Sequence, residues 1–309
     1  MKASQLITLF ALLAILAACG GQTGSTGMPG ATAQARVHRA TSGDLIYATG
    51  ACGGTCVLSY PAGTVVQTLN VGLGGACADS AGNVYITGGS SLYEYAHGGA
   101  TPINTFTVSE GEVNACSVEP TTGAIATTVF EASGFNVAIF ANASSPPTTY
   151  FISSEVQYLG YDSAGNLFVD GYGKPFSLYE LPKNGNSFTQ ISVSPSLVVR
   201  PGQVQWDGNY ITIEGIGINR GVALYRLSVS GSTATVVGTT NFNGVTRTAL
   251  QSWIQGDRIF IPYGSRGNGY RNVKVGVWKY PAGGKPLQKI KHFDKRADLQ
   301  AVSFSPGTH

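Results

Sequence analysis

The cysteines are the residues of this 309-residue chain whose chemistry is easiest to assign. Four of them, Cys52, Cys56, Cys77 and Cys116, lie between positions 52 and 116, and an even number suits disulfide bonding in an oxidising compartment. Three pairings are open. Cys52 and Cys56 enclose only three residues, which favours a local bridge and leaves Cys77 to pair with Cys116. A zinc site made of the four thiolates would need paired short spacings, which the sequence lacks.

Residues for acid–base or nucleophilic catalysis are scarce. The chain has four histidines, His38, His97, His292 and His309, and none of them forms a plausible Ser-His-Asp or Cys-His set. The four cysteines are expected to be oxidised. We therefore expect no catalytic residue, and the sequence favours a binding module over an enzyme.

The first 18 residues predict a secretory signal peptide. Lys2 is their only charge, an apolar stretch follows from Leu6 to Leu16, and the segment ends in Ala17-Ala18-Cys19. Small residues directly before a cysteine resemble the bacterial lipoprotein signal. The resemblance implies cleavage before Cys19 and attachment of acyl chains such as palmitate to it, which gives a stable membrane anchor. Gly20, rather than Asp, follows, which implies export to the outer membrane if the bacterium has one.

Residues 19–43 are expected to consist of the lipidated Cys19 and a flexible tether. Gly, Ala, Ser, Thr and Gln dominate this segment, and large apolar residues are nearly absent from it. Residues 44–305 predict one folded domain, and 306–309 a short tail.

A turn that feeds a strand occurs twice and indicates the architecture of this domain. The sequence Asp-Ser-Ala-Gly-Asn spans 79–83 and 162–166, and a β-rich run follows each copy. With 42 Gly, 15 Tyr and 13 Phe and no sustained helical periodicity, the composition favours an all-β fold. The intervals between successive strand starts, 39 to 49 residues, match those of a four-stranded propeller blade. These starts are Leu45, Val84, Ala124, Leu167, Tyr210 and Ile259.

The ends of the domain predict a closed ring. The first unit lacks an innermost strand, and the chain ends in an unpaired strand at 299–304. The turn Tyr-Pro-Ala-Gly occurs at 60–63 and again at 280–283, which places it in neighbouring units across the closure. We predict a six-bladed β-propeller of four-stranded blades, closed when the C-terminal strand joins the N-terminal blade, which leaves only short edges.

The repeat resembles that of NHL and related six-bladed propellers, which runs Gly-Ile-Ala-Val-Asp-x-x-Gly-Asn-Leu-Tyr-Val. Ala76–Ile86 and Leu159–Val169 match this pattern, and Asp207–Tyr210 is a shortened copy. Glu119–Gly123 and Gln255–Asp257 depart from it. The resemblance implies the fold and no activity.

Strand alternation bears on the remaining cysteine pair. Aligning Asp79 with Glu119 sets Cys116 opposite Ala76, so Cys77 and Cys116 point to opposite faces of equivalent inner strands. Neighbouring blades meet front to back, and a bridge between them needs this opposite parity. We therefore expect Cys77–Cys116 to join two neighbouring blades.

The variable connections are expected to share one face of the ring, opposite the two stereotyped turns. They are Ala51–Thr55, Glu214–Gly221 and Tyr263–Asn272, and binding residues concentrate on such loops. Polar residues where the inner strands begin form the candidate binding face. Their simplest interpretation is that they line a hydrated channel and satisfy backbone groups. They are Glu112, Asn114, Glu155, Gln157, Gln203, Gln251 and Gln300.

Calcium is the alternative interpretation of four of these residues. Glu112, Asn114, Glu155 and Gln157 carry oxygens of the kind that calcium accepts, six to eight at a time. Similar six-bladed gluconolactonase-like and arylesterase-like enzymes use a calcium ion placed in this way, which would imply a calcium-dependent hydrolase of esters or lactones. Those enzymes draw ligands from several blades, whereas both carboxylates here lie on consecutive units. We therefore expect no metal or other cofactor.

Positive charge is concentrated near the C-terminus. From Arg258 to Arg296 there are ten Lys or Arg and one acid, whereas the rest of the chain has nine basic and fifteen acidic residues. Such a basic sector attracts anionic glycans, lipid headgroups or acidic envelope proteins, although outward positions also need charge for solubility. Its principal residues are Arg266, Arg271, Lys274, Lys285, Lys289 and Lys291.

The sequence thus predicts an exported, lipid-anchored propeller that acts as a monomeric binding or assembly module at the bacterial cell envelope, with an unknown ligand. Its expected partners are the membrane, through the anchor, and an envelope protein, anionic glycan or lipid headgroup. Export and the lack of a recognised module argue against nucleic acid.

Overall fold

The computed structural model describes residues 43–172, 176–197, 200–217, 221–246, 250–266, 270–290, 293 and 298–307. The predicted signal peptide, Cys19 and nearly all of the tether lie outside these residues. The described chain forms β-strands and no helix. Accordingly, a helix able to span a membrane is not found within it.

Four of the sheets have four strands each. The first sheet has the order β24 (Ala301–Ser305), β1 (Leu45–Thr49), β2 (Thr55–Ser59) and β3 (Val65–Leu69). The second has β4 (Ala76–Ala78), β5 (Val84–Gly88), β6 (Ser91–Tyr95) and β7 (Asn104–Thr107). The third has β8 (Glu112–Val118), β9 (Ile125–Glu131), β10 (Gly134–Phe140) and β11 (Thr148–Ile152). The last has β20 (Trp253–Gln255), β21 (Arg258–Arg266), β22 (Tyr270–Lys279) and β23 (Gln288–Ile290).

A fifth sheet has eight strands and differs from the expectation of two separate units. One half contains β12 (Glu155–Tyr161), β13 (Leu167–Tyr172), β14 (Ser177–Leu181) and β15 (Thr189–Ser194). The other contains β16 (Arg200–Trp206), β17 (Ile211–Ile216), β18 (Gly221–Ser230) and β19 (Thr233–Thr246). The two halves are joined by a parallel pairing of their outer strands, in which Ser192, Val193 and Ser194 face Thr233, Ala234 and Thr235. The length of β19, 14 residues, lets its first residues reach β15.

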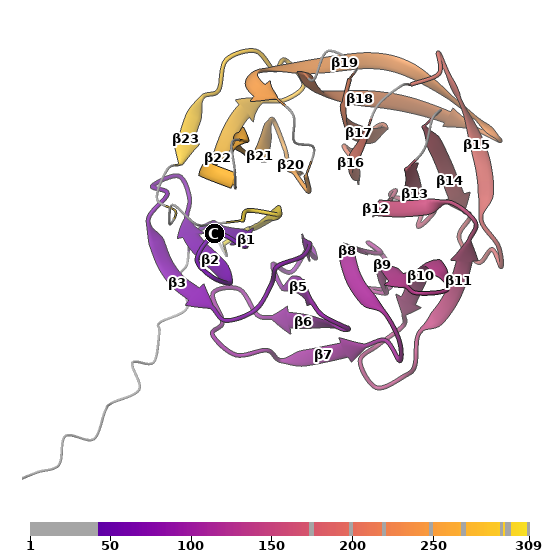
Figure 1. The fold of residues 1–309 in the computed structure, drawn as a ribbon, viewed down its shortest axis with the longest axis horizontal. Coiled ribbons are helices and arrows are strands. Elements are labelled where there is room, and N and C mark those ends of the chain that lie inside the picture. Colours follow the sequence, from indigo (N-terminus) through magenta and orange to yellow (C-terminus); the bar gives the residue numbers. More distant parts are fainter. Residues whose placement is uncertain are drawn as a thin grey trace, which may run out of the picture. The chain divides into compact units, whose positions relative to one another are not determined.

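The sheets are arranged around a common centre (Figure 1). The inner strands β8, β12, β16 and β20 lie nearest the centre, and β3, β7, β15, β19 and β23 lie along the rim. The observed second strands begin within one residue of the predicted starts.

The ring closes through the C-terminal strand, as the sequence predicted. β24 pairs antiparallel with β1 over five residue pairs, from Leu45 opposite Ser305 to Thr49 opposite Ala301. At this junction the Gly307 N–H donates to the Asp44 carboxylate at 3.0 Å. The closing strand therefore supplies the missing inner strand of the first sheet.

The hydrophobic core lies between neighbouring sheets. Ile46, Phe260 and Phe304 pack where the last sheet meets the first, and every residue of β24 is buried. Leu92 and Phe140 pack between the second and third sheets. The second strands, such as β1 and β5, are therefore buried on both faces, whereas the outer strands β3 and β7 expose most of their residues at least in part.

The repeated turn sequence has a specific structural cause. The Asp79 carboxylate accepts the Ala81 and Asn83 N–H groups at 2.9 and 2.8 Å, and also the Asn83 side-chain amide. Gly82 takes a positive φ of 87°, which glycine adopts without strain. Asp162 makes the same contacts in the second copy. The motif is therefore a side-chain-stabilised turn that fixes where the next strand begins.

Candidate functional site

Two disulfides join the cysteines in the predicted pairs. Cys52, in the loop between β1 and β2, bonds Cys56 of β2, with 5.4 Å between their Cα atoms. Cys77 of β4 bonds Cys116 of β8, with a Cα separation of 5.6 Å. The second bridge therefore connects the inner strands of the second and third sheets near the centre of the ring.

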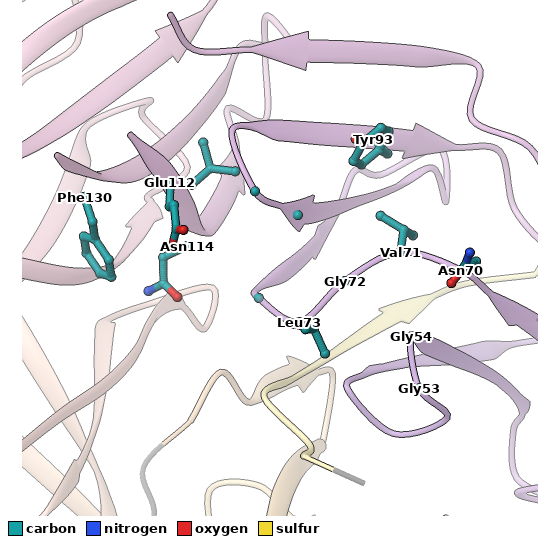
Figure 2. Close-up of a pocket in the computed structure, with 14 residues that line it drawn as sticks. Gly53, Gly54, Asn70, Val71, Gly72, Leu73, Tyr93, Glu112, Asn114 and Phe130 are labelled. Atoms are coloured by element: carbon teal, nitrogen blue, oxygen red, sulfur yellow. The ribbon is translucent and has the colours of Figure 1, made fainter. Parts of the chain in front are cut away.

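A hollow of about 530 Å³ opens on the side where the variable connections lie, and we call it the loop-face cavity. It is bounded by the β1–β2 and β5–β6 loops, the connection from β3 to β4, and the start of β8. Figure 2 shows Glu112, Asn114 and Phe130 on one side, Val71 and Tyr93 on the other, and Leu73 between them. Six of its lining residues are glycines, so backbone groups are accessible there. Leu73 is 72% exposed, which is unusual for a large apolar side chain.

The structure brings part of the predicted polar set to this cavity. Glu112 and Asn114 line it, and the Asn114 side-chain amide donates to the Gln157 carbonyl at 3.0 Å. Gln157 in turn donates from its side chain to the Glu155 carboxylate at 2.8 Å. Within the described residues, no group of three His, Cys, Asp or Glu side chains is placed to hold a metal ion. The arrangement offers one exposed carboxylate, Glu112, beside apolar walls.

Gln251 has a different position from that expected of a residue lining an open channel. It is 1% exposed, and its side-chain oxygen accepts the Ala76 N–H of the second sheet at 2.9 Å. Its side-chain nitrogen donates to the Cys116 carbonyl of the third sheet at 3.5 Å. The Gln251 N–H also donates to the Gln300 carbonyl at 3.3 Å. Gln251 therefore ties the last sheet to three others across the centre of the ring.

The sequence analysis missed a series of buried polar side chains on the second strands of successive units. The Thr49 hydroxyl donates to the Gly74 carbonyl at 2.6 Å, and Thr87 donates to Asn114 at 2.8 Å. Gly74 lies just before β4 of the second sheet, and Asn114 lies in β8 of the third. These hydroxyls therefore connect neighbouring sheets close to their inner strands. The members of the series are Thr49, Thr87, Thr128, Asp170 and Glu214, all of them buried. Their signal was a polar residue three or four positions after five of the six predicted strand starts, Ile259 being the exception.

Asp170 and Glu214 place carboxyl groups in this series, and both are 0% exposed. Burial raises the pKa of Asp170 well above its usual range, outweighing the Tyr158 and Gln157 N–H groups that favour the ionised form. Burial likewise raises the pKa of Glu214 to about 8, although the Ser252 hydroxyl and the Leu250 backbone lower it in part. Neither the Ser252 hydroxyl nor the Leu250 backbone lies in hydrogen-bond geometry with the Glu214 carboxyl group. Among the described residues, Asp170 Oδ2 and both Glu214 carboxyl oxygens have no hydrogen-bond partner.

Comparison with known proteins shows what these sheets form together. No protein-family model and no curated protein sequence matches this chain. Solved structures do match its fold. One is a protein of unknown function from Bacteroides caccae, with a TM-score of 0.62 and 11% identity over 84% of this chain and 98% of that one. A chain of a nidogen/laminin complex has a TM-score of 0.59 and 13% identity over 85% of this chain and 98% of that one. The fold is an all-β propeller. At these identities the likeness shows the fold alone.

The structure describes the side chains of three of the six principal residues of the basic sector. Lys285 and Lys289 are exposed around β23, and Lys274 of β22 is half-buried. The side chains of Arg266, Arg271 and Lys291 lie outside the described residues. The exposed lysines are thus on the rim of the last sheet, away from the loop-face cavity.

Proposed function

We propose that this protein is an exported, lipid-anchored, six-bladed β-propeller that acts as a binding or assembly module at the bacterial cell envelope, with the loop-face cavity as its contact surface. The count of six takes the two halves of the eight-stranded sheet as separate blades. Each half has four antiparallel strands, as the other sheets do, and three residue pairs join the halves. The turns at Asp79 and Asp162 support the likeness to NHL propellers.

The loop-face cavity is the observation that carries this proposal. It combines an exposed apolar side chain, Leu73, with a carboxylate, Glu112, and with accessible glycine backbone. Apolar surface with a few polar groups is typical of a site that binds a partner. The likeness to a chain from the nidogen/laminin complex is compatible with a role in assembly between proteins.

The proposed location depends on the N-terminal sequence. Cleavage before Cys19 and acylation of its sulfur would anchor the propeller through the tether of residues 19–43. The exposed Lys285 and Lys289 would then attract anionic glycans, lipid headgroups or acidic proteins, since residues 286–288 between them include no acidic side chain. Labelling cells with a palmitate analogue tests this step. The wild type should carry the label and sediment with membranes, and Cys19→Ala should do neither. Membrane association of the unlabelled variant would contradict the anchor.

Site-specific crosslinking tests the contact surface. A photoreactive phenylalanine in place of Leu73 should yield one dominant crosslinked product in living cells. The same residue in place of Phe151, which is 68% exposed on β11, is the matched control. The Leu73 product should be suppressed by excess unmodified protein and weakened by Glu112→Ala. Equal products from both positions, or none from Leu73, would show that the cavity is not the contact surface.

A further inference from the structure

A second cavity, of about 230 Å³, opens on the side of the ring opposite the loop-face cavity. It is lined by inner strands of the second, third, eight-stranded and last sheets, and by the turns after β8 and β12. We call it the turn-face cavity. It shares no lining residue with the loop-face cavity.

Aromatic side chains form much of its wall. Trp206 and Trp253 both line it, as does Tyr161. Trp253 comes from the last sheet yet packs against the cluster between the second and third sheets as well as the cluster between the last and first sheets. Both tryptophans are partly exposed, whereas the third, Trp278, is fully buried.

Two polar groups in the wall have unused hydrogen-bonding capacity. Gln203 is 4% exposed; its side-chain nitrogen donates to the Val204 carbonyl at 2.7 Å, and its Oε1 has no partner among the described residues. The Ser117 hydroxyl oxygen accepts the Tyr161 N–H at 3.1 Å, which leaves its proton available to donate. The Ser117 hydroxyl is thus a donor in the wall, whereas Gln203 Oε1 is a buried acceptor without a partner in the described part of the chain, which is costly and favours any side-chain rotation that would satisfy it.

The charge of the wall limits what can bind. The described lining includes one ionisable carboxylate, Asp162, and no Lys, Arg or His. Both Asp162 oxygens accept hydrogen bonds within its own turn, from Ala164 and Asn166. No cation is present to hold an anionic group, and no free carboxylate to attract a cation.

We propose that the turn-face cavity binds a single uncharged sugar ring. A sugar hydroxyl both donates and accepts, so one hydroxyl can accept from Ser117, and rotation of the Gln203 side chain toward the cavity would let its Oε1 accept from another. The apolar C–H face of a pyranose has partial positive charge that suits the electron-rich faces of Trp206 and Trp253. The volume lies below the range of about 300 to 1,000 Å³ typical of drug-sized ligands, which fits one ring and no longer oligomer.

Tryptophan fluorescence tests this assignment on the full-length protein. Methyl glycosides of glucose, galactose and mannose, together with N-acetylglucosamine, are titrated into the protein, with glucuronate and glucosamine as charged counterparts. At least one neutral sugar should give a saturable change that its charged counterpart does not give. Trp206→Phe should reduce the amplitude, since the buried Trp278 contributes no response.

Variants locate the binding. Gln203→Leu should weaken binding about tenfold, equivalent to about 1.4 kcal/mol, without changing the melting temperature by more than Gln288→Leu does. Gln288 is the matched control because its side chain bonds only the Pro61 carbonyl, outside the cavity. Leu73→Ala should leave sugar binding unchanged. An absence of saturable change with every neutral sugar, equal binding of charged sugars, or unaltered affinity in Gln203→Leu would each overturn the proposal.

Discussion

Thr128 and Asp170 occupy equivalent positions, each opposite the two residues of a bulge in an inner strand. The bulge facing Thr128 lies between Val113 and Cys116, and the bulge facing Asp170 lies between Val156 and Leu159. The Thr128 hydroxyl accepts the Ala115 N–H at 3.2 Å and donates to the Gln157 carbonyl of the next unit at 3.1 Å. Asp170 accepts N–H groups in the same way, and a protonated Oδ2 could donate as the threonine does. A neutral carboxyl thus fits the position and an ionised one does not.

Stability should fall as pH rises, because of Glu214. The pKa of Glu214 is about 8 in the folded protein, compared with an ordinary value of 4.5 that applies to the unfolded chain. Between pH 4.5 and pH 8 the folded state therefore holds a proton that the unfolded state has released. The free energy of unfolding should therefore decrease by up to about 1.4 kcal/mol per pH unit from pH 4.5 to 8. Urea unfolding at pH 5, 6, 7 and 8 measures this slope. Glu214→Gln should flatten it, and an unchanged slope in that variant would assign the dependence elsewhere.

Replacement of Asp170 should separate its charge from its hydrogen bonds. Asp170→Asn keeps an acceptor for the Tyr158 N–H, adds a neutral donor and cannot ionise. This variant should equal the wild type at pH 4 and exceed it in stability at pH 8. Asp170→Ala leaves backbone groups unsatisfied and should lose about 1 to 3 kcal/mol at both pH values. Chemical denaturation at the two pH values gives the comparison, and a less stable Asn variant at pH 8 would show that the carboxylate is ionised in the fold.

The two disulfides should stabilise the fold unequally. The chain-entropy relation gives about 4 kcal/mol for the 39-residue separation of Cys77 and Cys116, and about 2 kcal/mol for the 4-residue separation of Cys52 and Cys56. Paired Cys→Ser variants of each bridge, compared by urea unfolding, test this ratio. The reverse order would indicate that the local bridge supports a loop whose packing matters more than chain entropy.

Calcium should leave the melting temperature unchanged. Glu112 is the exposed carboxylate of the four predicted ligands, Glu155 accepts a hydrogen bond from Gln157, and among the described residues no three His, Cys, Asp or Glu side chains are grouped to hold a metal ion. Calorimetry of the protein in calcium and then in chelator measures the difference. A calcium-dependent rise, lost in Glu112→Gln, would instead support the ester or lactone hydrolase.

Local sequence features predicted much of the fold. The Asp79 and Asp162 turns are encoded by side chains within five residues, so the strand starts could be placed closely. The pairing of Cys77 with Cys116 followed by elimination from the local Cys52–Cys56 bridge, and strand alternation supported it once Asp79 was aligned with Glu119. Closure by the C-terminal strand followed from the count of strands in the first unit.

Contacts across the ring could not be predicted in this way. Gln251 bonds Ala76, which is 175 residues away, and no local pattern specifies that contact. The pairing of β15 with β19 depends on how far an outer strand extends, which alternation does not determine. Asp170 and Glu214 were overlooked because acidic residues are rarely buried, although their place in the Thr87 and Thr128 series was visible.

The pairing of β24 with β1 also has a consequence for biosynthesis. The first sheet is made from the beginning of the domain and from its last strand, so β1 has an open edge throughout translation. Completion of the chain is then coupled to protection of that edge, and a product truncated before Ala301 retains an unpaired strand able to recruit other chains. The exposed inner edge of β1 would therefore distinguish a truncated molecule from one that carries β24.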